Sequence, residues 1–496
     1  MKILWLRFGM IVPLAVLLAP AASPQSQASS EDAQQLRKLV EQMQAQMNRM
    51  QAEIDQLKGT KTEAASTQPT PAATAPSPSQ QGTIQTQEPA REGPRSPQVG
   101  TATAKYQQFS EDTQAAARFD NVPLDPKYHG YFRLPGTQTL LKIGGYFKSD
   151  FIYDLKPAGN TDSFIPSSFV IPQPTGVNNA TVSIRPTRLS VDFRVPTTMV
   201  GDARFYVEGD FFGTNATTPR LRHAYGQVKN FLLGQTFSNF MDPDGFPDTL
   251  DFQGPNGMVN VRNPQFRYGF ALSPSTTFYV AVEKPSSDVI FKTAQFTDQP
   301  NAPSPDGTIR LRQEWEGGHF QVSALFRSIA ASIGSGATAK TDSVFGWGIN
   351  TSLGFRTFGK DNVIFAVAAG HGISRYLQDT SGLGIDAEPN SSTTLAATPA
   401  VGIEAAYQHY WLKKLRSSAI YSYAAVNNTA FFSVATPKTY NHATYAGSNL
   451  IWNPFGSLNI GAEFLYGWAM QQNGLKANAP RIQFSAKYSF VKVDPD

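Results

Sequence analysis

Arginines recur on one face of a series of short alternating segments, and the guanidinium group is well suited to holding carboxylates. The stretch "RLSVDFRVPTTMVGDARFYVEGDFFG" (188–213) has a charged or polar residue at nearly every second position, with apolar residues such as Leu189 and Phe205 between them. A β-strand alternates its side chains with a period of two, so this pattern predicts one apolar face and one ionic face. The arginines expected on the ionic face are Arg188, Arg194, Arg204, Arg222, Arg267, Arg310 and Arg312.

A cluster of guanidinium groups on a wall of low dielectric constant would concentrate anions and bind carboxylates with bidentate geometry. Four of these residues are expected at a similar height along one wall: Arg188, Arg222, Arg267 and Arg310. The alternative is that each arginine pairs with a neighbouring acid only to balance its charge. The acids expected on the same face are Asp192, Glu208, Asp210, Glu314 and Glu316. The sequence leaves both interpretations open.

The elements that would position these side chains are sixteen predicted strands bounded by Gly, Pro, Asn and Asp. Their expected ranges are 140–154, 181–196, 202–212, 219–229, 231–237, 263–273, 276–284, 308–316, 319–328, 343–355, 361–374, 399–411, 414–427, 441–453, 456–468 and 480–490. Short connections such as "KN" and "EGG" alternate with long ones, including 155–180, 238–262, 285–307, 375–398 and 469–479.

Strict alternation of short turns and long loops over an even number of strands is typical of an outer-membrane barrel, whereas a β-sandwich has Greek-key connections. Backbone groups in lipid must all be paired, so the sheet must close on itself. We therefore predict an all-β fold, a 16-stranded antiparallel transmembrane β-barrel with an apolar outer face and a wet lumen. The six Trp and eighteen Tyr are expected to supply aromatic girdles at the two membrane interfaces.

The region before the barrel divides into three predicted parts. Residues 1–22 have Lys2 and Arg7, a short apolar run and small residues around Ala21, which is the pattern of a secretory signal peptide. Residues 31–58 contain apolar residues spaced alternately four and three apart, which predicts an α-helical coiled coil that needs partner helices. These residues are Leu36, Val40, Met43, Met47, Met50, Ile54 and Leu57.

Residues 59–138 are rich in Pro, Ser and Thr and predict a flexible linker, which leaves residues 139–496 for the barrel. The strand number of the coiled coil does not follow from these residues. If the coiled coil lies in the periplasm, the first strand runs outward and the sixteenth returns to the periplasm.

Composition and motifs argue against several functions. The formal charge of +4 is small for 496 residues, and no basic run suggests nucleic-acid binding. The chain has no Cys, its six His are scattered without metal-ligand spacing, and it contains no G-x-S-x-G motif. The segment "GSGATAKT" departs from a phosphate-binding loop, because Ala339 stands where that motif needs Gly. We therefore expect no enzyme activity, no cofactor and no metal.

Three stretches in order resemble the DcaP-like trimeric outer-membrane porins: "LKIGGYFKSDFIYDL" (141–155), "RLRHAYGQVKNFLLGQTFSNF" (220–240) and "GSNLIWNPFGSLNIGAEFLYG" (447–467). The signal peptide, heptads and linker belong to the same resemblance, which covers essentially the whole mature chain. It implies a homotrimer of barrels with a periplasmic coiled coil, in the outer membrane of a Gram-negative bacterium, passing small anionic solutes such as dicarboxylates by diffusion.

In porins the third long loop commonly folds into the barrel, and here that loop is "SNFMDPDGFPDTLDFQGPNGMVN" (238–260). Opposite the arginines, its acids would create a transverse field across a constriction. These acids are Asp242, Asp244, Asp248 and Asp251. A plain surface loop is the alternative.

The expected function is thus passive diffusion of small hydrophilic solutes, with anions favoured. Three alternatives stay open. A phosphate-selective porin would need a ladder of Lys and Arg down the pore, at which Lys142 and Lys148 hint. A structural tether would use the coiled coil to bind peptidoglycan, with the barrel as an anchor. An adhesin or receptor would act through its external loops.

Overall fold

The computed structural model of the chain describes residues 131–176, 178–197, 201–214, 217–289, 299–333, 340–390, 394–427 and 439–490. The predicted signal peptide, the coiled coil and nearly all of the linker lie outside these residues. Within the described ranges, no helix is both long and apolar enough to cross a membrane. The helices there are three short 3-10 turns: η2 (Pro166–Ser168), η3 (Pro243–Gly245) and η5 (Ser374–Tyr376).

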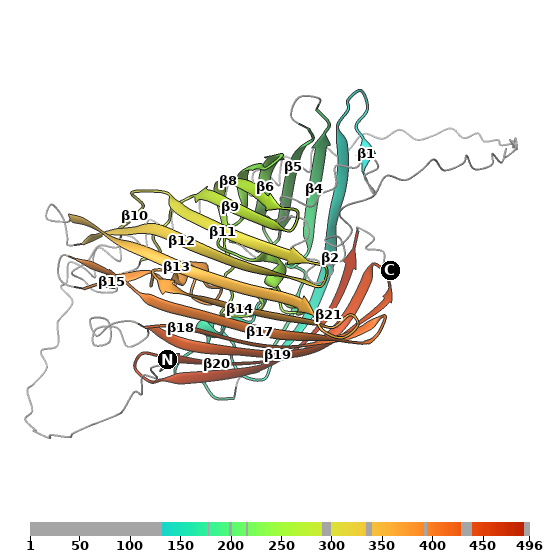
Figure 1. Cartoon of the computed structure of the whole chain (residues 1–496). Helices are drawn as coiled ribbons and strands as arrows, with labels where there is room; N and C mark the ends of the chain where they lie inside the picture. Colours follow the sequence, from blue (N-terminus) through green and yellow to red (C-terminus); the bar gives the residue numbers. More distant parts are fainter. Residues whose placement is uncertain are drawn as a thin grey trace, which may run out of the picture. The chain divides into compact units, whose positions relative to one another are not determined.

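One antiparallel sheet closes on itself to form a barrel (Figure 1). It contains nineteen strand segments. β3 and β4 both pair with β2, so they count as one interrupted strand. β10 (Gln299–Asn301) and β11 both pair with β12, so they likewise count as one. β1 (Phe132–Arg133) is a two-residue strand that pairs with β2. Without these three extra segments, sixteen strands remain, as predicted.

The sixteen strands, in chain order, are β2 (Leu140–Asp154), β3 (Asn179–Ser183) with β4 (Arg188–Val195), β5 (Ala203–Asp210), β6 (Arg220–Val228), β7 (Phe231–Phe237), β8 (Arg262–Ser273), β9 (Thr276–Glu283), β11 (Asp306–Trp315), β12 (Gly318–Ile333), β13 (Lys340–Arg356), β14 (Asn362–His371), β17 (Pro399–Leu412), β18 (Leu415–Val426), β19 (Tyr440–Phe455), β20 (Leu458–Gln471) and β21 (Lys476–Ser489). Every predicted strand is present, most with ends within three residues of the prediction. The short strands β1, β10, β15 (Ala387–Pro389) and β16 (Leu395–Ala397) were not predicted.

Closure comes from β21, which pairs with β2 from Tyr146↔Ser489 to Asp154↔Arg481. Short turns at one end of the barrel, such as 229–230 and 316–317, alternate with mostly longer loops at the other end. The prediction of a long connection over 469–479 is wrong, because the ladder continues to the pair Met470↔Lys476 and leaves only a tight turn. The two ends are called the short-turn end and the long-loop end below.

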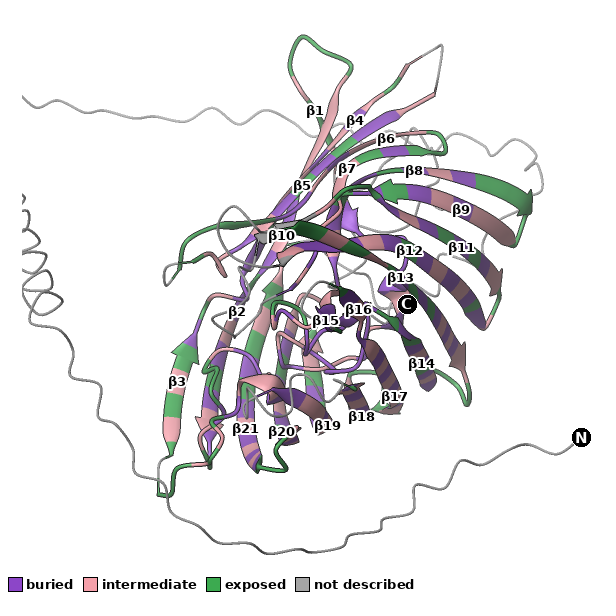
Figure 2. Ribbon diagram, turned by 90° about the vertical axis from the view of Figure 1, so that its left-hand side faces the viewer, coloured by how far each residue is buried: buried purple, intermediate pink, exposed green. Residues whose placement is uncertain are grey.

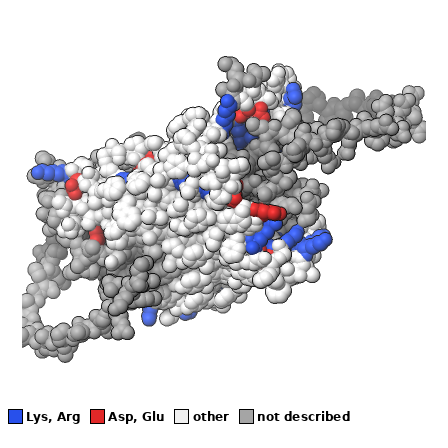
Figure 3. Space-filling model, viewed as in Figure 1, with Lys and Arg blue, Asp and Glu red and all other residues white. Residues whose placement is uncertain are grey.

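The two faces of the sheet differ as the period of two requires. On β2, Ile143, Phe147 and Phe151 are about half exposed on the outside, whereas Lys148 and Asp150 are buried inside. Figure 3 shows an outer surface that is largely uncharged, with charged residues mainly toward its two ends. An apolar outside and polar inside is the inverse of a soluble protein and matches a barrel that faces lipid.

Long loops pack inside the barrel and supply its apolar core. The contributing segments are loop 1 (155–178), loop 3 (238–261) and loop 6 (372–398). Their buried core residues include Phe164, Phe169, Phe240, Met241, Tyr376 and Leu377. Loop 6 also carries β15 and β16, which Figure 2 shows within the ring of strands.

Ionic contacts fix loop 6 in place. Arg327 of β12 donates to Asp386 at 2.9 Å and to the carbonyl oxygen of Gly372 at 2.6 Å. Both side chains are buried, so the inner wall and loop 6 are joined by a desolvated ion pair.

Replacing Ile349, which is 48% exposed near the middle of β13, by Arg should destabilise the barrel. A cation at mid-bilayer on the lipid face costs about 2–4 kcal/mol, and the cost falls to about 0–1 kcal/mol near the interface. Phe358→Arg is the matched control, because Phe358 is 81% exposed in the turn 357–361. Reversible urea unfolding in lipid vesicles measures both variants, and equal losses would contradict the assignment of the outer face to lipid.

Candidate functional site

All seven arginines singled out from the sequence point to the inner face. Each is at most 7% exposed: Arg188, Arg194, Arg204, Arg222, Arg267, Arg310 and Arg312. The apolar residues between them, including Leu189 and Phe205, are half exposed on the outside. The alternation therefore placed every one of these side chains on the correct face of the sheet.

Arg188 and Arg222 meet at one carboxylate. The Nε of Arg222 donates to Glu208 at 2.9 Å, and Arg188 lies 4.0 Å from the same oxygen. Arg222 also donates to Asp210 at 2.8 Å, and Arg220 binds Asp210 through two nitrogens. These contacts place acidic partners beside the arginines, as the charge-balance interpretation expects.

A β-bulge brings this group together. Glu208 pairs with His223 whereas Gly209 pairs with Leu221, so Arg222 is the extra residue in β6. The bulge lets both Arg222 and His223 lie on the inner side, where they are 3% and 0% exposed. A regular strand would send one of the two side chains toward lipid.

Arg194 and Arg204 form a second group at the short-turn end, around Asp192. Arg204 binds one carboxylate oxygen through two nitrogens at 3.0 and 2.7 Å, and the Nε of Arg194 lies 3.3 Å from the other oxygen. The guanidinium of Arg204 also lies 5.0 Å from the ring centre of Tyr206, within the range of a cation–π contact.

Arg267 and Arg310 flank Tyr279 on β9, with guanidinium carbons 6.0 and 4.0 Å from the ring centre. Through successive cross-strand pairs, Arg267 is level with Leu232, Gln227 and Arg204. The expectation that Arg267 and Arg310 share the height of Arg188 and Arg222 stays a prediction, because a row of cross-strand pairs lies perpendicular to the tilted strands and does not follow the barrel axis. The strands are staggered, and sequence spacing alone does not reveal their register.

Arg312 holds two of the loop 3 acids directly. Its guanidinium donates to Asp242 at 3.0 Å, to Asp244 at 2.5 Å and to Glu314 at 2.8 Å. Burial alone would raise the pKa of Asp242, but His319 at 2.7 Å, Arg312 and Ser352 outweigh it and hold that pKa well below its usual range. Asp242 is thus a carboxylate at neutral pH.

The other two acids also contact the wall. Asp248 accepts from Arg416 at 2.5 Å and from Gln408 at 2.9 Å. Asp251 accepts from the backbone N–H of Phe164 at 2.9 Å, which joins loop 3 to loop 1. Burial raises the pKa of Asp251, against the opposing effect of Arg481 and of the N–H groups it binds.

Loop 3 lies inside the barrel along the wall formed by β11 to β21 and β2. The carbonyl of Leu250 accepts from Lys148 at 2.5 Å and from Gln483 at 2.8 Å, and the backbone N–H of Asp251 donates to Glu463 at 2.7 Å. The structure therefore places the loop in the lumen, and its four acids anchor it there. Their role in a transverse field stays a prediction.

A close backbone approach seats the loop at Gly257. A Cβ added there would lie 2.1 Å from the carbonyl oxygen of Tyr423, and a Cβ on Gly402 would lie 2.0 Å from the carbonyl oxygen of Gly257. Such distances exclude any side chain at either position, so glycine is required for the loop to rest on β17 and β18.

Sequence reasoning missed Arg262, the first residue of β8. Its Nε donates to Nε2 of His223 at 3.4 Å, and its guanidinium lies 4.8 Å from the ring centre of Phe237. The predicted strand began at 263, so Arg262 was counted with loop 3. Extending the predicted strand by one residue, to begin at 262 as β8 does, would have included Arg262 among the strand arginines.

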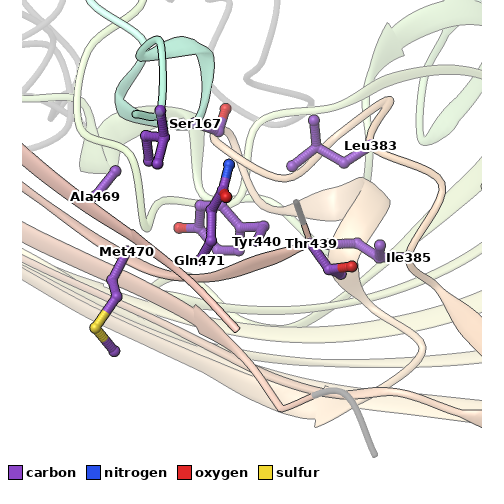
Figure 4. A pocket seen from close by; sticks show the side chains of 9 residues that line it. Ser167, Leu383, Ile385, Thr439, Tyr440, Ala469, Met470 and Gln471 are labelled. Atoms are coloured by element: carbon purple, nitrogen blue, oxygen red, sulfur yellow. The ribbon is translucent and has the colours of Figure 1, made fainter. Parts of the chain in front are cut away.

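Two other kinds of site are poorly supported. A cavity of about 90 Å³ lies at the long-loop end, between loops 1 and 6 and the strands β19 and β20 (Figure 4). Its lining includes Ser167, Leu383, Ile385, Tyr440 and Met470. Pockets for drug-sized ligands occupy about 300–1,000 Å³, so this one is too small. Among the residues described, no three His, Asp or Glu side chains are grouped to hold a metal ion.

Replacing Gly257 by Val should displace loop 3 and raise single-channel conductance, because the side chain overlaps the backbone of β17 and β18. Overpacking of this kind costs about 1–3 kcal/mol, which the barrel can tolerate. Gly245→Ala is the control in the same loop, since its Cβ would meet only atoms 3.6 Å away or more. Unchanged conductance in a folded Gly257→Val barrel would show that loop 3 does not restrict the lumen.

Comparison with known proteins agrees with this architecture. A family described as DcaP outer membrane protein matches residues 133–490. Among curated proteins, none is similar enough to match. The solved outer membrane channel DcaP of Acinetobacter baumannii is 23% identical, with a TM-score of 0.63, and the match covers 72% of this chain and 99% of that chain.

Two other solved structures are more distant. OmpT of Vibrio cholerae, folded in vitro, is 12% identical with a TM-score of 0.45, over 72% of this chain and 99% of that chain. An anion-selective porin from Comamonas acidovorans is 9% identical with a TM-score of 0.47, over 71% of this chain and 100% of that chain. The fold is shared with the Acinetobacter channel, and the family match spans the barrel from β1 to beyond β21. The chain belongs to the DcaP outer membrane protein family.

Proposed function

We propose that this protein is a passive outer-membrane porin through which small hydrophilic solutes diffuse, and that it favours small anions such as dicarboxylates. The family match and the sixteen-stranded barrel support an outer-membrane channel over an enzyme. The preference for anions rests on the charges of the inner wall. Several wall arginines contact acids, so a cation without such a contact would contribute most to the preference.

Arg262 is such a cation, and the lack of a carboxylate beside its guanidinium is the observation that carries the proposal. Within the described part of the chain, no carboxylate lies within 4.0 Å of its guanidinium, and its one hydrogen-bond partner is His223. The side chain is half-buried, and its two terminal nitrogens are not sealed from solvent. Two donors of a planar fork are thus available to a solute.

The surroundings strengthen the field at Arg262. His223 lies 3.9 Å from Glu208, the carboxylate that Arg222 binds and Arg188 approaches. Phe252 of loop 3 lies 5.5 and 5.6 Å from the guanidinium carbons of Arg188 and Arg222. Apolar groups beside cations lower the local dielectric constant, which increases the attraction for an anion. A carboxylate bound here would exchange with water and leave without any chemical step.

The alternative of a phosphate-selective porin receives less support. Its pore would need a ladder of Lys and Arg, at which Lys142 and Lys148 hint, but Lys148 donates to the carbonyl of Leu250 and lies 3.5 Å from Asp150. That lysine therefore helps to seat loop 3. A continuous series of available cations along the lumen is not formed by these two residues.

We also propose the assembly and location that the sequence suggests. Residues 1–22 direct export, residues 31–58 form a periplasmic coiled coil, residues 59–138 link it to the barrel, and residues 139–496 insert into the outer membrane of a Gram-negative bacterium. The heptads would join three protomers below the membrane, and lipid would cover the rest of the outer face. A peptidoglycan partner belongs to the tether alternative, which no feature of the barrel favours.

Replacing Arg262 by Gln should lower the anion-to-cation permeability ratio about threefold, because an available guanidinium raises the local anion concentration. The effect should be larger at about 0.01 M salt than at about 1 M, since the Debye length falls from about 30 to about 3 Å. Reversal potentials across planar bilayers under a potassium chloride gradient measure it.

Arg133→Gln is the control for this measurement, because it makes the same chemical change at an exposed position in β1. A cation-selective or closed wild-type channel would overturn the proposal. An unchanged permeability ratio in Arg262→Gln would show that Arg262 does not contribute to the anion preference.

Deleting residues 31–58 should lower the temperature at which the oligomer dissociates while leaving each barrel folded, since the heptads would act outside the membrane. Native mass spectrometry in detergent, after incubation at increasing temperature, reports the oligomer. If deletion leaves the oligomer unchanged but releases the protein from isolated cell wall, the coiled coil is a tether.

A further inference from the structure

A second group of cations lies at the short-turn end, on the inner faces of β2, β4 and β5. Lys142 stands opposite Asp192 in the β2–β4 ladder, where an ion pair would be expected. Arg204 instead binds one oxygen of Asp192, and the Nε of Arg194 lies 3.3 Å from the other. Among the described residues, Lys142 forms no ion pair within 4.0 Å with the carboxylate across from it.

The ammonium group of Lys142 is available to a solute. Among the residues with described positions, none is hydrogen-bonded to its Nζ, and no carboxylate lies within 4.0 Å of it. Its described contact is the ring of Tyr131, 5.5 Å from Nζ to the ring centre. The side chain is half-buried, so desolvation is partial and the charge still acts on the lumen.

Tyr131 supplies a hydroxyl to the same place. Arg194 donates to this hydroxyl at 3.4 Å. Burial, together with the charge of Asp192, raises the pKa of Tyr131, so the phenol keeps its proton. The phenol is hydrogen-bonded to Asp192 as well as to Arg194, so it helps to hold that carboxylate in place beside the ammonium group.

We propose that Lys142, with Arg194, Arg204 and Tyr131, forms an anion-binding site at the short-turn mouth of the barrel, separate from the site at Arg262. It takes a small solute with a carboxylate or phosphate group. This inference rests on the proposed porin function and adds a binding step on the periplasmic side. An anion that leaves the Arg262 region would meet this site last.

The two available cations are far enough apart to act independently. Lys142 lies on β2 and Arg262 on β8, which are five strand spacings apart in the sheet. At about 4.8 Å per spacing, this is about 24 Å around the wall. That exceeds the Debye length of about 8 Å at physiological salt, so substitutions at one site should leave the other nearly unchanged.

The test is block of the chloride current by malonate or by inorganic phosphate, added to one side of a bilayer that contains single full-length channels. The chain has no Cys, so Asn473→Cys in the exposed turn 472–475 can mark the long-loop side with an impermeant thiol reagent. Lys142→Gln should raise the half-blocking concentration about tenfold from the short-turn side only, because a charge-assisted hydrogen bond is lost.

Lys413→Gln is the matched control, because it removes the same charge from an exposed turn at the same end. Lys142→Arg should restore block. Block by only one of the two anions would support the site and identify the group it prefers. Equal block of Lys142→Gln and wild type, or an equal change from both sides, would overturn the inference. A wild-type channel without anion preference that still shows the Lys142 effect would overturn the proposed function and leave this site standing.

Discussion

Pairing between β21 and β2 is the contact on which the other features depend, because it joins the last strand of the barrel to the first. Closure in this way pairs the backbone groups of both strands, so the sheet can carry apolar side chains outward into lipid. Its inner face is then free to be polar. Buried groups such as Arg481 and Asp154, 2.6 Å apart near the closing seam, are tolerated only because the enclosed face supplies partners for them.

Those inner charges differ in their partners. Arg312, Arg327 and Arg416 hold loops 3 and 6 to the wall through short ion pairs with loop carboxylates. A lost partner would leave a buried charge uncompensated, so such pairs fix the loop positions strongly. Arg262 and Lys142 have no carboxylate within 4.0 Å in the described region. Cations of the first kind hold ordered loops in the lumen, and under the proposed function those of the second kind would attract solutes.

The sequence allowed the strands and their faces to be predicted because apolar and polar side chains alternate along a strand wherever one face contacts lipid and the other the lumen. Leu189 and Arg188 were assigned to opposite faces correctly for that reason alone. Features set by contacts distant in sequence could not be predicted. The bulge at Glu208 and Gly209 depends on the register shift between β5 and β6. The row in which Arg267 lies depends on the registers of three strand pairs. The partners of the loop 3 acids depend on where the loop rests on the wall, which the spacing of those acids in the sequence does not reveal.

Weak, separated binding suits a passive channel better than one strong site. A solute that binds tightly at a single site enters easily but leaves slowly, whereas two weaker binding sites allow both entry and exit. Under the proposed function, the wall would meet this condition because acids pair with several of its arginines: Asp192 pairs with Arg194 and Arg204, and Glu208 pairs with Arg222. One available cation then remains near each group, Lys142 at the first and Arg262 at the second. Acids on the arginine wall would then do more than balance charge, since they would limit how tightly an anion is held near each group.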